Sequence, residues 1–418
     1  MERRTFLKIL SSAGIVSLVS PTFAMEVCKN KVSKSSSALL ESAFRNPPFS
    51  SGVYTWWHWM NGNITKDGIT RDLEAMKANG IAGYQLFEAG SGIPIGPVES
   101  LSDEWVDLIL HTLKESERLG LEFAMHNCPG WSSSGGPWIT PDKAMQIITW
   151  SETKITGGKQ VRIQLPTPKH MFDYYIDTYC LAIPANMKVI PRLSILELSN
   201  RLDKDGVLTW DVPTGEWLIM RFGQTAKDQK NKSAPSKSTG LDCDKFSTEA
   251  LDYHLNCMFK RLMPAMEKIA KHSKIGLLID SYETGDQDWT SDMPAYFEQS
   301  HGYELYPFLP VLANKIVESE ESTKRFLFDF RRVRADMFAE RYYGHFQKRC
   351  KEKGIITYTE PYGGNMMEEL QVAQQLDINM GEFWCGQTVL WANYKYNRTV
   401  KQVASIAHTL GGKVVGAE

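Results

Sequence analysis

The sequence lacks a surplus of either charge. It holds 47 Lys and Arg residues against 49 Asp and Glu residues, for a formal net charge of -2. A protein that grips a nucleic-acid backbone needs clustered positive charge to release counterions from the phosphates. The balance of charges therefore argues against a nucleic acid as partner.

Several catalytic and metal-binding signatures are missing too. The seven cysteines form no CxxC pair, which argues against a zinc knuckle or a thioredoxin-like motif. Most of them are predicted to be small buried hydrophobes, although an oxidising compartment leaves one or two disulfides open. There is no HExxH, and Gly130–Gly136 matches neither a phosphate loop nor the GxSxG elbow of serine hydrolases.

Long apolar runs are absent beyond the first residues, so no stable membrane span is expected. The start itself combines charged residues, an apolar stretch from Ile9 to Val19 and small residues before Ala24, which predicts a signal peptide over residues 1–24. Its two arginines resemble a twin-arginine export signal; an ordinary secretory signal is the alternative, and a lipoprotein anchored at Cys28 fits less well. The protein is expected to be exported, to the periplasm or the extracellular space.

Apolar runs alternate with segments of helical spacing along most of the chain. This order predicts an α/β protein, a (β/α)8 TIM-type barrel with helices outside a parallel sheet. Helices are expected at 69–78, 102–119, 248–272, 321–353 and 398–410, and strands at 52–60, 81–87, 121–126, 275–280, 355–359, 378–384 and 414–417. The eighth strand is expected near an insertion, and because the chain ends at Glu418 the barrel is expected to be truncated at its last strand.

The insertion interrupts this pattern between about residues 150 and 225. Apolar and polar residues alternate there between turns rich in glycine, which is typical of antiparallel strands. A Lys/Ser-rich link over 227–238 marks its far border. The predicted parts are therefore a first barrel part over 40–149, an inserted β-rich module over 150–230 and a second barrel part over 240–418.

Four glutamates lie at or just after the ends of predicted strands and so face the expected active-site end of the barrel: Glu283, Glu360, Glu382 and Glu418. A single carboxylate at a strand end is often a helix cap or an ion-pair partner. Four together favour glycoside hydrolysis, which needs one carboxylic acid and one carboxylate. Further carboxylates can bind a hard cation through oxygen or orient sugar hydroxyls, and Glu360 is predicted to bind the substrate.

Neutral polar and aromatic groups follow the earlier strands and are predicted to bind sugar hydroxyls. They are His58, Asn61, His126, Asn127 and Trp131. The alternative for the two histidines is a structural, half-buried imidazole, and for the tryptophan a place in the core.

Several motifs resemble glycoside hydrolase family 106, the α-L-rhamnosidases, from about residue 45 to the end. They are Trp56–Thr65, Gly83–Phe87, Met125–Ile139, Asp280–Glu283, Tyr358–Gly364 and Gly416–Glu418. The resemblance implies an inverting, calcium-dependent hydrolase that removes terminal α-L-rhamnose from plant or microbial glycans. It implies Glu283 as general acid, Glu418 as general base and Glu382 near the Ca2+ ion. Members of the family are longer, with β-domains after the barrel.

Two other hypotheses remain beside this one. The chain could be a truncated, inactive glycan-binding remnant of such an enzyme, which a rhamnosidase assay would distinguish. A twin-arginine-exported redox protein is disfavoured because no cofactor motif follows the signal.

Overall fold

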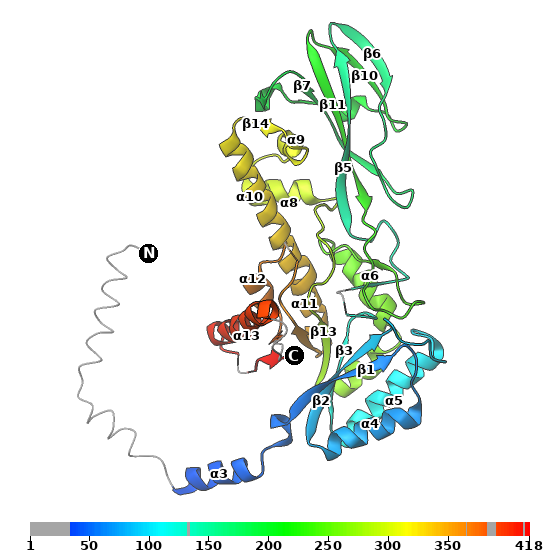
Figure 1. Cartoon of the computed structure of the whole chain (residues 1–418), viewed down its shortest axis with the longest axis vertical. Coiled ribbons are helices and arrows are strands. Elements are labelled where there is room, and N and C mark those ends of the chain that lie inside the picture. The colour runs from blue at the N-terminus through cyan, green and yellow to red at the C-terminus, as the bar shows by residue number, and fades with distance from the viewer. Residues whose placement is uncertain (1–33, 132–133, 365, 383–389, 413) are drawn as a thin grey trace, which may run out of the picture. The chain divides into compact units, whose positions relative to one another are not determined.

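A computed structural model describes residues 34–131, 134–364, 366–382, 390–412 and 414–418. The predicted signal peptide lies outside the described residues. The chain divides into two compact units, Met1–Val53 and Tyr54–Glu418. The first contains helix α3 (Lys34–Arg45) and a 3-10 turn at Phe49–Ser51. The second unit contains the sheets and the other helices, and its first strand, β1, begins where the two units meet in the sequence (Figure 1).

A sheet of seven strands carries the site. Its strands lie side by side in chain order, and from β2 to β17 every neighbouring pair is parallel. They are β1 (Val53–Met60), β2 (Ile81–Ala89), β3 (Glu122–His126), β13 (Ile275–Ile279), β15 (Ile356–Thr359), β16 (Ile378–Gly381) and β17 (Gly416–Ala417). All seven strands predicted for the barrel are therefore present.

The sheet is curled. The side-chain amide of Gln85 on β2 lies 3.1 Å from the sulfur of Met380 on β16, although three strands separate β2 from β16 in the sheet. Only strong curvature brings such distant strands together across the concave face. Within the described residues β1 and β17 are the two edge strands, so these residues form a curled, open sheet and not an eight-stranded closed barrel.

Among the described residues, no eighth strand near the insertion joins this sheet. Instead, two short strands, β4 (Gly135–Gly136) and β12 (Leu241–Asp242), pair with each other antiparallel. This pairing joins the residues before the insertion to those after it. Strands of two residues are too short for a hydrophobic pattern to predict them.

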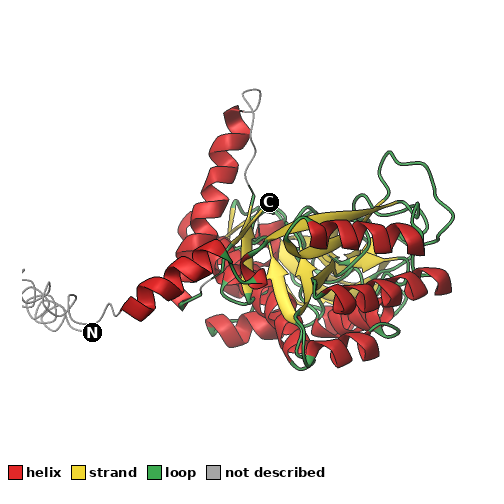
Figure 2. Ribbon diagram, turned by 90° about the horizontal axis from the view of Figure 1, so that it is seen from below, coloured by secondary structure: helices red, strands yellow, loops and turns green. Residues whose placement is uncertain are grey.

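Helices follow the strands and lie around them (Figure 2). Helix α4 (Lys66–Ala78) begins at Thr65, whose hydroxyl accepts from the Gly68 amide, and α5 (Asp103–Leu119) begins in the same way at Ser102. The remaining helices are α6 (Thr248–Phe259), α7 (Met263–Ala270), α8 (Met293–His301), α9 (Leu309–Leu312), α10 (Glu320–Met337), α11 (His345–Lys351), α12 (Glu369–Ala373) and α13 (Leu390–Leu410).

Two predicted helices are each divided in the structure. The stretch 248–272 forms α6 and α7, because Pro264 has no amide hydrogen to continue a helix and instead occupies the first turn of α7. The stretch 321–353 forms α10 and α11 with a π-helical turn, Phe338–Gly344, between them. Helices α3, α8, α9 and α12 were not predicted.

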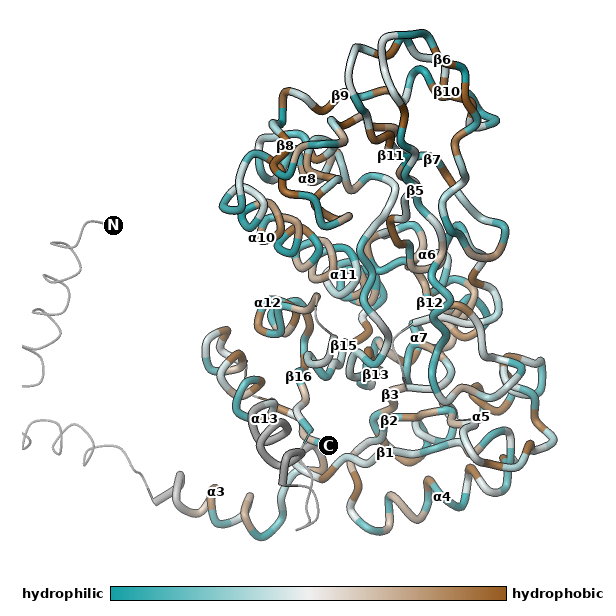
Figure 3. Tube along the Cα trace, turned by 45° about the horizontal axis from the view of Figure 1, so that its top comes forward, coloured by the Kyte–Doolittle hydropathy of each residue, from teal (hydrophilic) through white to brown (hydrophobic). Residues whose placement is uncertain are grey.

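The region between β3 and α6 holds antiparallel sheets, as its alternating pattern predicts. A four-stranded sheet has the order β5-β11-β7-β9, and β6 pairs with β10. The strands are β5 (Gln146–Thr156), β6 (Lys159–Gln164), β7 (Ile176–Pro184), β9 (Leu196–Glu197), β10 (Val207–Val212) and β11 (Glu216–Ala226). Hydrophilic and hydrophobic residues are interspersed along them (Figure 3). A short parallel pair, β8 (Val189–Ile190) with β14 (Ile316–Val317), joins this region to the segment before α10.

The structure describes five of the seven cysteines. Cys128, Cys180, Cys243 and Cys350 are buried, and Cys257 is exposed. The prediction that most are small buried hydrophobes is therefore confirmed for four of these five. In the same part of the chain, no helix combines the length and the apolar character needed to span a bilayer.

Candidate active site at the carboxyl end of the parallel sheet

Strand alternation decides which side chains enter the site. An apolar cluster fills the concave face of the sheet and includes Leu278, Tyr358 and Met380. Successive side chains on a strand point to opposite faces, so the residues two positions later point to the same face as these three. Those residues are Asp280, Glu360 and Glu382. The carboxylates thus lie directly beyond an apolar floor, at the carboxyl ends of β13, β15 and β16.

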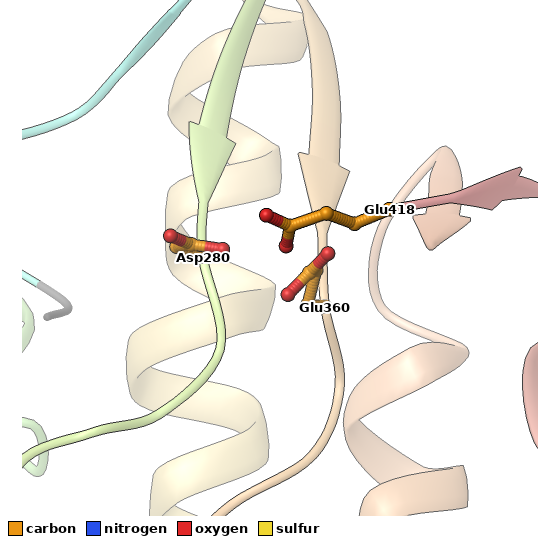
Figure 4. Close-up of side chains that lie close together, drawn as sticks. All are labelled: Asp280, Glu360 and Glu418. Carbon is orange, nitrogen blue, oxygen red and sulfur yellow. The ribbon is translucent and has the colours of Figure 1, made fainter. Parts of the chain in front are cut away.

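Three carboxylates from three strand ends converge. Asp280 and Glu360 are buried and Glu418 is exposed, and each offers an oxygen within 4.8 Å of the others (Figure 4). The backbone amide of Glu418 donates to the carbonyl of Gly381 at 2.8 Å, which holds the end of β17 against β16. The site therefore gathers acidic residues that are up to 138 positions apart (418 minus 280) in the sequence.

Burial and mutual repulsion raise the pKa of each of these carboxyl groups. For Asp280 the main cause is burial, followed by the charges of Glu418 and Glu283. Burial also comes first for Glu360, and the charge of Asp280 adds to it. The pKa of Glu418 is raised by partial burial and by the charge of Glu382. A raised pKa favours the protonated form of a carboxyl group, whereas a bound cation would favour the ionised form.

A phenol links two of the glutamates. The hydroxyl oxygen of Tyr362 lies 2.6 Å from a carboxylate oxygen of Glu360 and 2.6 Å from one of Glu382. The hydroxyl has one hydrogen and can donate it to only one of them at a time. The second short contact is a hydrogen bond only when that carboxyl group is itself protonated and donates to the phenol oxygen. Tyr362 therefore couples the protonation of Glu360 to that of Glu382.

Hydrogen bonds to its backbone fix the position of Glu382. Its amide donates to the hydroxyl oxygen of Thr399 on α13, and that hydroxyl lies 2.9 Å from the Glu382 carbonyl. Glu382 is outside the group of three converging carboxylates, although the family resemblance implied that it lies near the metal. Its contact with Tyr362 nonetheless makes it part of the same acidic cluster.

Glu283 lies in the loop that follows β13 and is exposed. Its carboxylate is 3.7 Å from the ammonium of Lys232. The charge of Glu283 raises the pKa of both Asp280 and Glu418, so its carboxylate is within electrostatic reach of the cluster. Of the five acidic residues, Glu283 and Glu418 are the exposed ones and thus the two best placed to touch a substrate.

The two histidines line the concave face beside the carboxylates. The rings of His58 and His126 lie 5.6 Å and 5.0 Å from that of Phe87. Burial lowers the pKa of His58, and it lowers the pKa of His126 to about 4. Both imidazoles are therefore neutral near pH 7. Nδ1 of His126 lies 2.8 Å from the Cys128 carbonyl, and its Nε2 has no hydrogen-bond partner among the described residues.

The two asparagines are engaged with the protein's own backbone. The amide nitrogen of Asn61 donates to the Ile93 carbonyl at 2.7 Å, and that of Asn127 donates to the Leu278 carbonyl at 2.9 Å. These contacts anchor the loops after β1 and β3. Trp131 packs against the apolar floor of the concave face. A role for these three residues in substrate binding stays a prediction.

Three residues of the cluster were not singled out from the sequence. Asp280 is the first residue after β13, so its position alone could have revealed it. Tyr362 offered a weaker signal, two residues after Glu360. Lys232 offered none, because it belongs to a Lys/Ser-rich stretch expected to be a simple link.

The three converging carboxylates have the chemistry of a site for a hard cation. Calcium binds six to eight oxygen ligands, and carboxylates are the preferred ones. Asp280, Glu360 and Glu418 supply such oxygens at mutual distances that one ion can bridge. An ion there would also offset the repulsion that raises their pKa values.

A curled parallel sheet with an acidic cluster at its carboxyl end is an architecture of glycoside hydrolases, which act through pairs of carboxyl groups. The chain belongs to glycoside hydrolase family 106. The model of that family, described as alpha-L-rhamnosidase, matches residues 45–180 and 169–418.

Two relatives are similar over 91% of this chain. One, from Formosa agariphila, is named a putative beta-glucuronidase and is 41% identical. The other is the solved structure of a rhamnosidase from Novosphingobium sp. PP1Y, with a TM-score of 0.83 at 24% identity, which shows the shared fold. The chain spans 35% of the length of the first relative and 53% of the second.

Proposed function

We propose that this protein is an exported hydrolase, periplasmic or extracellular, that removes terminal α-L-rhamnosyl residues from plant or microbial glycans with inversion of configuration. The family assignment supports the reaction class. The observation that carries the proposal is the acidic cluster, in which two exposed glutamates flank two buried carboxylates. We further propose that the seven strands belong to a (β/α)8 barrel, which their order and curl support.

In this proposal Glu283 is the general acid. It stands in a solvent-facing loop, on the side where a departing alcohol can leave. Glu418 is the general base that takes a proton from the attacking water. Its side chain is exposed, so water can reach its carboxylate. An inverting pair has carboxyl groups roughly 6.5–9.5 Å apart, which leaves room for that water.

The buried carboxylates of Asp280 and Glu360 would hold a Ca2+ ion beside Glu418. When bound, the ion would supply positive charge that orients sugar hydroxyls and keeps the neighbouring carboxyl groups ionised. Glu382 stays close to this group through Tyr362. The neutral imidazoles of His58 and His126 can exchange hydrogen bonds with sugar hydroxyls without adding charge.

The test is release of rhamnose from an aryl α-L-rhamnoside by the purified protein, with and without a chelator. Nuclear magnetic resonance of the first product tells which anomer forms. β-Rhamnose as first product and loss of activity with the chelator are expected, whereas α-rhamnose would contradict inversion. Binding of rhamnose without turnover at any Ca2+ concentration would instead favour an inactive glycan-binding protein.

Hydrolysis of a β-glucuronide is the second candidate function. It is favoured by the name of the relative that is 41% identical. An aryl β-glucuronide assayed beside the rhamnoside distinguishes the two.

A further inference from the structure

The Lys/Ser-rich segment 227–238 forms part of the rim of the site. The amide of Gly90, after β2, donates to the Ser233 carbonyl at 2.7 Å, and the amide of Trp131, after β3, donates to the Lys232 carbonyl at 3.3 Å. The side-chain amide of Asn231 donates to the Pro129 carbonyl at 3.0 Å. The segment is thus fixed to the loops that follow two neighbouring strands.

These close backbone contacts constrain the loops beneath. A side chain at Gly130 would collide with the Lys232 carbonyl, 2.0 Å from where its Cβ would be. One at Gly90 would meet the backbone of Pro235 at 2.6 Å. The rim segment therefore has a defined place, and so does the backbone that carries Lys232.

Two lysines of this segment reach the loop after β13. The ammonium of Lys227 donates to the Asp286 carbonyl at 2.5 Å. Lys232 places its ammonium 3.7 Å from Glu283, and the two side chains are 53% and 41% exposed. An ion pair of this exposure contributes little free energy, so an incoming anion can displace it readily.

The proposed reaction requires this ion pair to separate. A general acid must carry its proton when the substrate binds, and a protonated Glu283 is no longer a counterion for Lys232. The ammonium then stands beside the leaving-group oxygen without its anionic partner. A negative charge on the leaving-group sugar would take the place of the Glu283 carboxylate.

On the basis of the proposed function, we propose that Lys232 recognises the carboxylate of a uronic acid residue that carries the terminal rhamnose. The substrate class is then an α-L-rhamnosyl uronate, and Lys232 is a specificity-determining residue on the leaving-group side. Its charge also compensates for bringing an anion near an acidic cluster, where five carboxyl groups otherwise repel it.

The experiment compares two disaccharides that differ in one group. One is α-L-rhamnosyl glucuronic acid, and the other is the same compound with its carboxyl group reduced to a primary alcohol. At low ionic strength we expect kcat/KM of the wild-type protein to be about tenfold higher for the uronate, and added salt to reduce this ratio. The ratio should fall to near one in Lys232→Gln and be largely kept in Lys232→Arg.

Lys237→Gln is the matched control. Lys237 lies on the same segment and pairs with Glu99 instead of Glu283. It removes one positive charge from the segment without touching the site, so the ratio should stay at the wild-type value. Equal melting temperatures of the variants would exclude a folding defect as the cause.

Three results would overturn the proposal. The first is a wild-type ratio near one, and the second is a Lys232→Gln variant that loses activity on both substrates by the same factor, as expected if Lys232 only positions Glu283. The third is hydrolysis of an aryl β-glucuronide that depends on Lys232, which would place the bound carboxylate on the donor sugar. Absence of activity on aryl rhamnoside as well would be a failure of the proposed function itself.

Discussion

Asp280 and Glu360 are the first residues after two adjacent parallel strands, and the register of those strands sets their carboxyl groups side by side. Ile279 pairs with Thr359, so the next residue of each strand enters the site at the same level. Both side chains are almost fully buried, with 5% and 0% of their surface exposed. Two buried carboxyl groups in contact repel each other unless a proton or a cation lies between them. This pair is therefore the electrostatic centre of the site.

Removing this centre should weaken calcium binding. We expect Ca2+ to raise the melting temperature of the wild-type protein, because a ligand that binds only the folded state stabilises it. Asp280→Asn should reduce or abolish that shift, since it removes one of the three converging oxygens. Differential scanning calorimetry with and without Ca2+ measures it. An undiminished shift in the variant would place the ion elsewhere.

Rates of Glu283→Gln on two substrates should show whether Glu283 acts as a general acid or only binds the substrate. Loss of a general acid costs about 10²–10⁴-fold in rate. The loss should be large for a sugar leaving group and much smaller for a nitrophenyl leaving group, which departs without protonation. Equal losses in kcat for both substrates would contradict the assignment. Glu418→Gln is the contrast, because a missing base should slow both substrates alike.

Glu88 should make stability depend on pH in the opposite direction to an ordinary carboxylate. Burial raises its pKa from 4.5 to about 7, and the Ser100 hydroxyl donates to it at 2.7 Å. The folded state then binds more protons than the unfolded state, so the stability that Glu88 contributes is present below pH 4.5 and lost as pH rises through about 7. Glutamine does not ionise, so Glu88→Gln should not lose this stability, which amounts to up to about 3 kcal/mol above pH 7.

Urea unfolding of wild type and Glu88→Gln at pH 5 and pH 8 measures this effect. The free energy of unfolding of Glu88→Gln, relative to that of the wild type, should be higher at pH 8 than at pH 5. Glu99→Gln, which removes an exposed carboxylate, controls for net charge. Parallel pH dependence in the wild type and Glu88→Gln would show that Glu88 ionises normally.

Removing one partner of the buried ion pair between Lys245 and Asp242 should destabilise the protein strongly, whereas replacing both partners with apolar residues should cost little stability. Both side chains are fully buried, and the ammonium also lies 3.1 Å from the Ser134 hydroxyl and 5.0 Å from the ring centre of Tyr342. Lys245→Met leaves a buried carboxylate alone and should cost about 3–5 kcal/mol. The double variant with Asp242→Leu should recover most of it, because it removes both charges. Chemical denaturation of the three proteins tests this.

Much of the parallel sheet could be predicted from the sequence because each strand is a short apolar run with a helix signal behind it. Ser102 and Thr65, for example, mark helix starts through a local hydrogen bond that needs no tertiary structure. Likewise, Glu360, Glu382 and Glu418 were found by their position at strand ends. The break at Pro264 was equally local, although it was not predicted.

Other features depend on contacts between distant residues and leave no local signal. The pairing of β4 with β12 joins residues more than 100 positions apart. The bond between Gln85 and Met380 results from the curl of the sheet, which no single strand encodes. Lys232 reaches Glu283 only because backbone hydrogen bonds hold its segment against the loops after β2 and β3.

The sequence by itself determined the seven strands of the sheet, the antiparallel character of the insertion and the acidic character of the site, because periodicity and strand-end position are local properties. Only the tertiary structure decided which acids meet, that Tyr362 joins Glu360 to Glu382, and that a lysine stands beside Glu283. The physical reason is that burial, repulsion and pairing depend on distances through space, and strand register and sheet curvature set those distances.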